Sequence, residues 1–503
     1  MPNIYTHIDQ LIAYALDRGL IEEQDKTWAI NEILSVLQLT DYQPSKFKAK
    51  KFRHAADVLQ PLCDWAASQG LISPDTVTQR DLFDTKLMNI FTARPSEVIS
   101  EFAVLYRTQS PQTATDKFYH DARALNYIRT DRVAKNIVWK ASTAYGPLDI
   151  TINMSKPEKD PKDIAAAAQV KSSGYPQCLL CKENEGYAGH AAHPARQNIR
   201  LIPMDLLKDG HPWYLQYSPY VYYNEHCICL SDKHQPMKLT RTSFARLLNF
   251  VELLPHYFMG SNADLPIVGG SILTHDHFQG GRYAFAMEKA PLERTFKLKK
   301  FPRVKAGIVR WPMSVIRLTG SKTDLIAASD YILKKWRNYS DPAVGILSQS
   351  GNVPHNTITP IARRRGKNFE IDLVLRNNRT APKFPMGIFH PHAEVHHIKK
   401  ENIGLIEVMG LAVLPSRLAT ELAALQPLLI QRNIRKITKD PSLNKHAAWA
   451  KQLLARYTFT PKNAKRILRQ EVGQVFVKVL EYAGVFKCTP KGQAAFDRFL
   501  QKL

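Results

Sequence analysis

The chain has 503 residues, 44% hydrophobic and 23% charged, which is an ordinary composition for a folded, water-soluble protein. Its 69 Lys and Arg residues outnumber its 45 Asp and Glu residues, and the formal net charge of +24 attracts anions. The six cysteines are too few for a disulfide scaffold, and no stretch reaches the ~20 apolar residues that a membrane span needs.

The basic residues are scattered, as in segments 46–53, 363–367 and 432–439, rather than gathered in one long run. This distribution is more typical of a solvated face than of a nucleic-acid groove, and a phosphate-rich small substrate would also benefit from it. The first residues lack the basic start and apolar run of a signal peptide. We therefore expect a cytoplasmic protein with no membrane segment.

The first 110 residues are predicted to be helical. Apolar residues recur at helical spacing in segments 4–16, 28–37, 55–69 and 96–106, and Pro61 should kink or split the third of these. No catalytic constellation stands out in this region, so helical packing or an interaction surface is the default interpretation.

The character of the sequence changes near Pro111, and from Tyr127 onward short strands alternate with turns, which indicates an α+β fold. We predict a loop at 155–161, a helix at 243–254, and strands within 148–153, 217–230, 307–318, 356–361 and 369–375. A helix at 405–425, with a boundary or kink at Pro415, leads into a largely helical and basic C-terminal part.

The segment Gly269-Gly-Ser-Ile-Leu-Thr-His-Asp-His-Phe-Gln-Gly-Gly281 carries the strongest chemical signal. If it is a strand, His275, His277 and Gln279 share one face, because side chains alternate along a strand. Two imidazoles and an amide on one face are costly to bury without partners, and the flanking glycine pairs let the backbone approach a ligand. The alternative is a row of solvent-facing side chains, which this pattern disfavours.

This segment resembles the histidine-triad superfamily motif in its His-x-His-x-Gln form. Its wider sequence is similar to the second sequence class of UDP-glucose–hexose-1-phosphate uridylyltransferases, the galactose-1-phosphate uridylyltransferases. Four further segments fit the same family in the expected order: 127–136 (YIRTDRVAKN), 152–161 (INMSKPEKDP), 175–181 (YPQCLLC) and 389–415, which begins FHPHAEVHHIKKENIG. The resemblance thus covers most of the chain from Tyr127 to Pro415.

The resemblance implies a duplicated histidine-triad-like antiparallel sheet flanked by helices, although no repeat is visible in the sequence. We expect four regions: a helical N-terminal region (1–110), a half with the catalytic motif and zinc ligands (111–300), a second half on the sugar-phosphate side (301–420) and a helical basic C-terminal region (421–503). The family also suggests a homodimer.

The implied reaction moves a uridylyl group from UDP-glucose to galactose 1-phosphate, giving UDP-galactose and glucose 1-phosphate. Carried over from the family, His277 is the nucleophile and Gln279 holds the substrate phosphate. Neutral imidazole is a competent nucleophile near neutral pH, and the sugar phosphate leaves as a stable anion. An amide can hydrogen-bond phosphate oxygens but cannot shuttle protons, which suits transfer rather than hydrolysis. A covalent uridylyl-histidine predicts ping-pong kinetics.

Negative charge that builds on the phosphoryl oxygens calls for nearby donors and cations. Arg282 directly follows the second glycine pair and is the first candidate. The other candidate substrate-binding residues lie in segments that resemble the family, and they are Arg129, Arg132, Lys156, Lys159, His392, Lys400 and Glu407. Taken singly, each of the arginines and each of Lys156 and Lys159 would more often be a surface charge, whereas the resemblance assigns His392, Lys400 and Glu407 to the sugar-phosphate pocket.

Cys178 and Cys181 form a C-x-x-C pair whose spacing suits a zinc site, with a redox pair as the alternative. No thioredoxin-like pattern surrounds the pair, which favours zinc. The family places zinc on such a pair, a downstream histidine and the first histidine of the triad motif, which correspond here to His234 and His275. A Cys₂His₂ set is a closed structural shell that would orient the neighbouring His277. For His234, a surface histidine is the alternative.

A second histidine cluster contains His390, His392, Glu394, His396 and His397. The family associates a second metal with a nearby His-x-His, but its remaining ligands have no match in this chain. A second metal is therefore left open and disfavoured.

Two other functions share part of this pattern. A nucleoside-polyphosphate phosphorylase of the same superfamily would differ in its leaving group, so label exchange between sugar nucleotides and sugar 1-phosphates distinguishes it. A basic zinc-containing nucleic-acid-binding protein would need interleaved aromatic side chains, and the basic C-terminal region has few of them. The uridylyltransferase is therefore the favoured interpretation.

Overall fold

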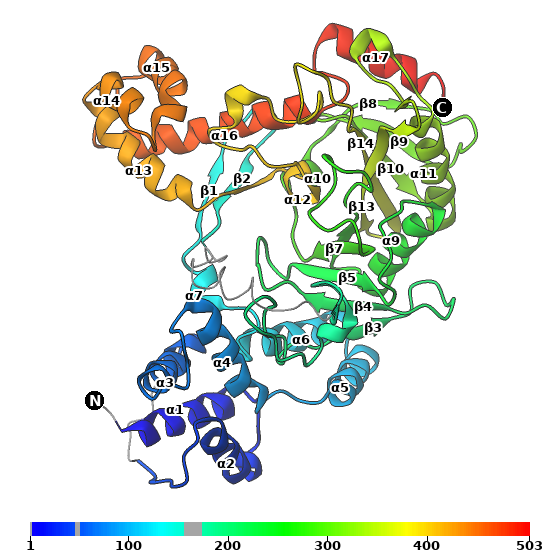
Figure 1. Ribbon diagram of the computed structural model, residues 1–503. Helices are drawn as coiled ribbons and strands as arrows, with labels where there is room; N and C mark the ends of the chain where they lie inside the picture. Colours follow the sequence, from blue (N-terminus) through cyan, green and yellow to red (C-terminus); the bar gives the residue numbers. More distant parts are fainter. Residues whose placement is uncertain (1–2, 46–50, 155–173) are drawn as a thin grey trace. The chain divides into compact units, whose positions relative to one another are not determined.

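The computed structural model describes residues 3–45, 51–154 and 174–503 (Figure 1). The chain divides into two compact units. Unit 1 consists of Met1–Lys135, Ser155–Gln235 and His275–His277, and unit 2 of Asn136–Met154, Pro236–Thr274 and Phe278–Leu503. The loop predicted at 155–161, with Lys156 and Lys159, lies outside the described residues. In the part of the chain that the structure describes, no helix is long and apolar enough to cross a membrane.

Helices form the first part of unit 1 (blue to cyan in Figure 1). They are α1 (Ile4–Asp17), η1 (Glu23–Asp25), α2 (Lys26–Val36), α3 (Ala56–Ser68), α4 (Val77–Asn89), α5 (Pro95–Thr108), α6 (Pro111–Ala124) and α7 (Thr130–Val133). The predicted helices at 4–16, 28–37, 55–69 and 96–106 are confirmed as α1, α2, α3 and α5. Pro61 lies inside α3 without splitting it. The sequence does not predict α4 or α6.

Local signals begin several of these helices. The side chains of Asn3, Thr76 and Ser110 cap α1, α4 and α6 by accepting hydrogen bonds from backbone N–H groups of the first turn. Pro95 and Pro111 occupy the first helical positions of α5 and α6, where a missing N–H costs nothing. Helices α1 to α4 then bury one apolar core, which includes Leu11, Ile33, Val58 and Leu87.

Unit 1 also contains a short antiparallel arrangement of β3 (Ile202–Met204), β4 (Trp213–Tyr217) and β5 (Cys227–Ser231). The predicted strand region at 217–230 therefore holds the end of β4 and most of β5, with a loop between them. The hydroxyl group of Tyr217 donates to the Thr115 carbonyl oxygen at 3.0 Å and ties β4 to α6.

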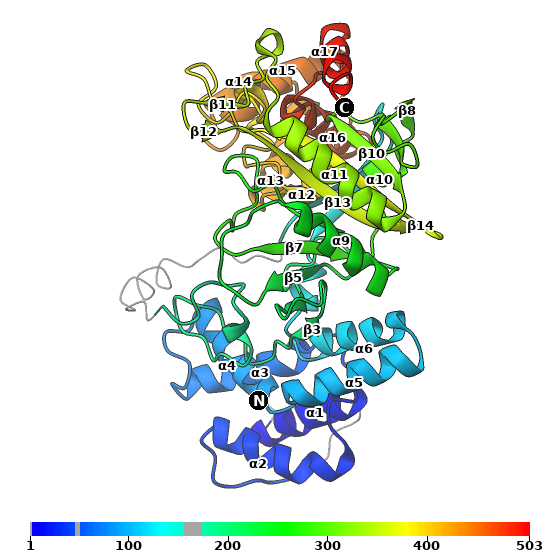
Figure 2. The same ribbon diagram turned by 90° about the vertical axis from the view of Figure 1, so that its right-hand side faces the viewer.

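Unit 2 contains a large antiparallel sheet flanked by helices, which confirms the α+β fold class. Its strands follow the order β7 (His277–Gly281, whose first residue belongs to unit 1), β6 (Phe258–Gly260), β13 (Asn356–Arg365), β14 (Asn368–Asn377), β10 (Val315–Gly320), β9 (Lys305–Val309) and β8 (Leu292–Phe296). Helices α9 (Arg241–Leu253) and α11 (Lys322–Arg337) lie beside β13 and β14 (Figure 2). The predicted helix at 243–254 and the strands at 356–361 and 369–375 are confirmed. The stretch 307–318 forms parts of two strands.

A smaller sheet carries the order β1 (Ile137–Ala141), β2 (Leu148–Ile152) and β15 (Leu411–Leu414), and β2 confirms the strand predicted at 148–153. The remaining elements are α10 (Ala286–Lys289), η3 (Pro342–Val344), β11 (Gln349–Ser350), β12 (Val353–Pro354), η4 (Ala393–Val395), α12 (Leu405–Val408), α13 (Arg417–Ile430), α14 (Ile434–Lys439), η5 (Asn444–His446), α15 (Ala447–Arg456), α16 (Ala464–Ala483) and α17 (Pro490–Leu500).

The prediction of one helix at 405–425 is wrong, although the boundary predicted at Pro415 is confirmed. The short helix α12 ends at Val408, β15 pairs in parallel with β2, and α13 begins only after Pro415. The apolar run Leu411–Leu414 therefore serves as a buried strand, because backbone pairing with β2 outweighs its helical spacing. The helical character of the C-terminal part is confirmed by α13 to α17.

Candidate metal centre and active-site histidine

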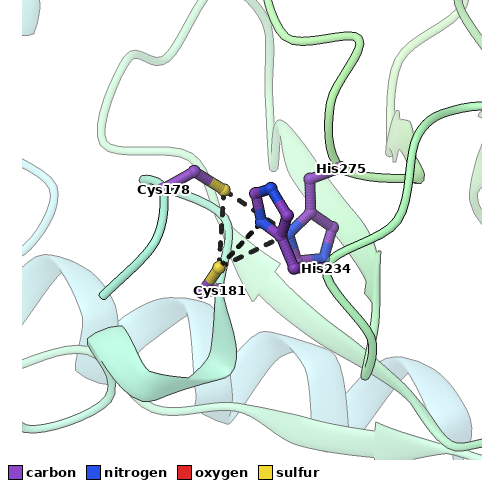
Figure 3. Close-up of side chains that lie close together, drawn as sticks. All are labelled: Cys178, Cys181, His234 and His275. Carbon is purple, nitrogen blue, oxygen red and sulfur yellow. Dashed lines mark hydrogen bonds between the residues drawn. The ribbon is translucent and has the colours of Figure 1, made fainter. Parts of the chain in front are cut away.

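Four side chains of the kinds that bind metals gather within unit 1. Cys178 and Cys181 lie in the turn before η2 (Lys182–Asn184), His234 follows β5, and His275 precedes β7. Their ligand atoms all lie within 4.8 Å of one another, and Figure 3 shows both imidazoles turned toward the sulfur atoms. In the part of the chain that the structure describes, this is the one group of at least three His, Cys, Asp or Glu residues placed to share an ion.

The spacing of these donor atoms suits a tetrahedral ion. The Sγ atoms of Cys178 and Cys181 lie 3.5 Å apart, and the His275 Nδ1 atom lies 3.4 and 3.6 Å from them. The Nδ1 atom of His234 lies 3.3 Å from the Cys181 Sγ atom. Zinc bonds of about 2.3 Å to sulfur and about 2.0 Å to nitrogen at the tetrahedral angle would separate two sulfurs by about 3.8 Å, and a sulfur from a nitrogen by about 3.5 Å. The residues present therefore fit a structural zinc ion.

The imidazole of His275 is held in the orientation that metal binding needs. Its Nε2 atom donates to the carbonyl oxygen of Ser231 at 2.8 Å, so its Nδ1 atom, which faces the cysteines, keeps its lone pair. The ring is fully buried, and burial lowers its pKa below the usual range. Backbone bonds from Ser231 N to Asp276 O and from Asp276 N to Gln235 O fix the adjoining chain. Such an outer hydrogen bond is the usual partner of a metal-bound histidine.

His277 begins β7 and is buried, with 4% of the residue exposed. Its Nδ1 atom donates to the carbonyl oxygen of His275 at 2.8 Å, which leaves the Nε2 lone pair available. Burial lowers the pKa of His277 to about 4, against a smaller opposing effect of this hydrogen bond. The ring is therefore neutral near pH 7, as a nitrogen nucleophile must be.

Gln279 is half-buried on β7, two residues beyond His277. Strand alternation directs both side chains to the same side of β7. The strand begins only at His277, so the expectation of one continuous face that includes His275 is not met. Gly280 is required by packing, because a Cβ atom there would lie 2.3 Å from the Phe258 carbonyl oxygen of β6. The second glycine pair thus lets β7 approach β6.

Of the three arginines predicted to bind phosphate, Arg129 and Arg132 form ion pairs with carboxylates of α4. Arg129 donates to both carboxylate oxygens of Asp84 at 2.6 and 2.8 Å, and Arg132 does the same with Asp81 at 2.8 and 2.5 Å. These ion pairs give both arginines a part in holding α7 to α4. Arg282 is half-buried directly after β7. The roles of Arg129, Arg132 and Arg282 in substrate binding stay predictions, as do those of Lys156 and Lys159.

The second histidine cluster is divided among separate partners in unit 2. The ring of His392 stacks between Phe384 and Tyr482, with ring centroids 4.3 and 4.1 Å away. The Nδ1 atoms of His397 and His446 lie 3.0 Å apart. The remaining members have other contacts: His390 with Asn402, Glu394 with the Tyr482 hydroxyl, and His396 with the Pro391 carbonyl oxygen.

The sequence singled out Lys400 and Glu407, but the structure pairs Glu407 with the neighbouring Lys399. The Nζ atom of buried Lys399 lies 3.0 Å from a Glu407 carboxylate oxygen, whereas Lys400 is exposed. Asn262 is a further buried polar residue that sequence reasoning missed. Its Oδ1 atom accepts from the backbone N–H of Leu405 at 2.9 Å, at the start of α12. No spacing pattern links Asn262 to residue 405, so only the fold reveals it.

The fold and the site define a class: an α+β protein in which a Cys₂His₂ cluster adjoins a buried, neutral histidine on a sheet strand. Residues 20–236 match the family model "Galactose-1-phosphate uridyl transferase, N-terminal domain", and residues 250–446 match the model of the C-terminal domain. Proteins named galactose-1-phosphate uridylyltransferase from Clostridium acetobutylicum, Halalkalibacterium halodurans and Bacillus subtilis are 54%, 53% and 49% identical. The alignments cover 99%, 100% and 100% of this chain and 99%, 99% and 98% of those proteins.

The chain belongs to the galactose-1-phosphate uridylyltransferase family and is a transferase.

Proposed function

We propose that this protein exchanges UMP between UDP-glucose and galactose 1-phosphate, by a ping-pong reaction through a uridylyl group on His277. The observation that carries the proposal is the buried hydrogen bond from His277 Nδ1 to the His275 carbonyl oxygen, 2.8 Å long. It defines one tautomer, in which Nε2 is the nucleophilic atom. The names of the full-length relatives support the substrates.

In the first half-reaction, His277 Nε2 attacks the α-phosphorus of UDP-glucose. A nitrogen–phosphorus bond forms, the bond from that phosphorus to the bridging oxygen breaks, and glucose 1-phosphate leaves with the electron pair. No proton has to move, because the attacking nitrogen carries none and the leaving phosphate is a stable anion.

The charge that appears on the imidazole is accommodated by the same hydrogen bond. Uridylylated His277 is an imidazolium whose Nδ1–H still points at the His275 carbonyl oxygen, and this bond strengthens as the ring becomes positive. The second half-reaction reverses these changes. A phosphate oxygen of galactose 1-phosphate attacks the phosphorus, the nitrogen–phosphorus bond breaks, and neutral His277 is restored with UDP-galactose.

Gln279 supplies amide N–H donors to the non-bridging phosphoryl oxygens in both half-reactions, and it has no proton to give to water. Arg282 is the nearest cation in sequence that would stabilise charge on these oxygens. The other proposed contacts to substrate phosphate and sugar are Arg129, Arg132, Lys156, Lys159, His392, Lys400 and Glu407.

Cys178, Cys181, His234 and His275 would hold a structural zinc ion, whose chemistry is to cross-link the two thiolates and two imidazoles rigidly. Because His275 both faces the cysteines and accepts the His277 hydrogen bond, its position sets the direction of the His277 ring. From the family resemblance we further propose a homodimer that acts in the cytoplasm, which sedimentation and cell fractionation would check.

The decisive experiment is trapping of the intermediate. The protein is mixed with UDP-glucose labelled in its uridine, quenched in mild alkali and digested, and the labelled peptide is mapped. Label on the peptide that contains residues 269–281, its absence in His277→Ala and its retention in the exposed-histidine control His120→Ala are expected. Label on another peptide would refute His277 as nucleophile, and label exchange confined to nucleoside polyphosphates would indicate a phosphorylase.

A further inference from the structure

The side chain of Asn184 joins the two halves of the C-x-x-C turn. Its Nδ2 atom donates to the carbonyl oxygens of both Cys178 and Cys181, at 2.8 and 2.7 Å. Only 2% of the residue is exposed. Since carbonyl oxygens cannot donate, the nitrogen of the amide must face the cysteines, and both of its N–H groups are used there.

His193 completes this arrangement from the other side. Its Nε2 atom lies 2.7 Å from the Oδ1 atom of Asn184, and because Oδ1 can only accept, His193 donates. The amide of Asn184 therefore has every donor and its acceptor occupied in a buried position. A network satisfied in this way has one low-energy arrangement, so it fixes the backbone to which it is bonded.

The position of His193 is itself fixed by hydrogen bonds and packing within the loop 185–196. The backbones of His190 and His193 exchange two hydrogen bonds, at 2.8 and 2.9 Å, and the Tyr187 ring packs edge-on against His193. Within this loop, Gly189, at φ +76°, lies so close to Ala195 that a Cβ atom on it would lie 2.5 Å from Ala195 N. Loop 185–196 thus presents His193 rigidly to Asn184.

We infer that Asn184, held by His193, is the positioning residue of the metal centre, setting the separation of the two cysteine sulfurs before an ion binds. This rests on the proposed zinc site. The sulfurs lie 3.5 Å apart, close to the spacing that two zinc–sulfur bonds need, so little reorganisation accompanies binding. Outer-shell partners of this kind typically contribute about 10–100-fold to metal affinity.

The test measures zinc affinity by chelator competition on the full chain, and the absorption spectrum after Co²⁺ substitution. Asn184→Asp keeps the shape but turns an oxygen toward two carbonyl oxygens, and we expect zinc affinity to fall ~10–100-fold. His193→Phe should lower it too, while His193→Gln, which keeps an N–H donor, should restore much of it. The Co²⁺ ligand-field bands should change in Asn184→Asp.

Asn198→Asp is the matched control, because Asn198 is also buried in unit 1 and donates to a carbonyl oxygen, that of Leu125, at 2.8 Å. It should keep the zinc affinity of the unaltered protein. Unchanged affinity in both Asn184→Asp and His193→Phe would overturn the inference while leaving the zinc site standing. Absence of zinc binding by the unaltered protein would instead overturn the zinc site itself. If Asn184→Asp does not fold, the comparison of His193→Phe with His193→Gln decides.

Discussion

The Nδ1 atom of His277 and the carbonyl oxygen of His275 are joined by a hydrogen bond of 2.8 Å, and the two residues belong to one unit of the fold. The bond couples a candidate metal ligand to the candidate nucleophile over two residues of chain. It also assigns the tautomer of His277, and burial holds the ring neutral.

The pH dependence of uridylylation should reflect this environment. Burial lowers the pKa of His277 to about 4, and the neutral ring is the nucleophile, so the rate should be lost only as the pH falls toward that value. We expect the rate of a single turnover with UDP-glucose, followed by quenched flow, to be flat from about pH 5.5 to 8. An acid limb near the ordinary histidine pKa of about 6.5 would contradict this environment.

Gln279 should matter in both half-reactions. In Gln279→Glu a carboxylate faces the negatively charged phosphoryl oxygens, so the rate of each half-reaction should fall by about 10²–10³. The measurement is single-turnover formation and discharge of uridylyl-His277. Gln349→Glu is the control, since this exposed glutamine lies on β11, outside β7 and the metal cluster, and it should keep near-normal rates. Loss of only one half-reaction would argue against a shared phosphate contact.

Removal of the metal should disable the nucleophile without altering it chemically. Cys181→Ser should lose zinc, measured by elemental analysis, and should slow uridylylation because His275 and His277 lose their fixed orientation. Cys63→Ala removes a thiol that is equally buried in unit 1 but lies in a helical core, and it should retain zinc and activity. Full activity in zinc-free Cys181→Ser would show that the cluster does not orient His277.

The Nε2 atom of buried His446 lies 2.9 Å from a Glu421 carboxylate oxygen, and its Nδ1 atom lies 3.0 Å from the Nδ1 atom of His397. These hydrogen-bonded side chains should make unit 2 sensitive to acid. Burial, with smaller contributions from the charges of His446 and Arg417, lowers the pKa of His397 to about 3, and Glu421 also contacts Lys445. Since this folded value lies below the unfolded value, the stabilisation is complete above about pH 6.5 and is lost as the pH falls. The loss should reach ~2 kcal/mol between pH 6.5 and 5.

The measurement is the transition temperature of unfolding against pH for His397→Phe. This variant should be less stable at neutral pH, because the Nδ1 atom of His446 loses its contact with His397, but its stability should fall less steeply with acid. His396→Phe changes a half-buried ring outside this hydrogen-bonded chain and serves as the control. Equal slopes in all three proteins would contradict the assignment.

The sequence predicted the elements that a single periodic pattern defines. Helix α1 and strand β2 were predicted from the spacing of their apolar residues, and the C-x-x-C spacing indicated the cysteine pair. Helix α4 was not predicted, because its buried residues include the charged Asp84. The burial of this carboxylate is explained by its ion pair with Arg129, 45 positions along the chain. The stretch Leu411–Leu414 was misassigned because its pairing with β2 lies more than 250 residues away in the sequence.

The candidate site likewise contains some residues that a local motif predicts and others that only the fold reveals. His275, His277 and Gln279 were identified by a local motif, and the structure brings His275 to the cysteines as the family resemblance implied. Asn184, Asn262 and Lys399 make buried polar contacts whose partners no local pattern indicates. Such residues become visible only when the fold brings distant backbone groups together.

The close approach of β7 to β6 at Gly280 has a consequence for the variation that the protein can tolerate. Any other residue would place its Cβ atom against the backbone carbonyl oxygen of Phe258. Relieving this clash would require β7 to move away from β6, which would displace the adjacent Gln279. In a library randomised at this codon and selected for catalysis, glycine should be the sole survivor, even though the residue has no chemistry of its own.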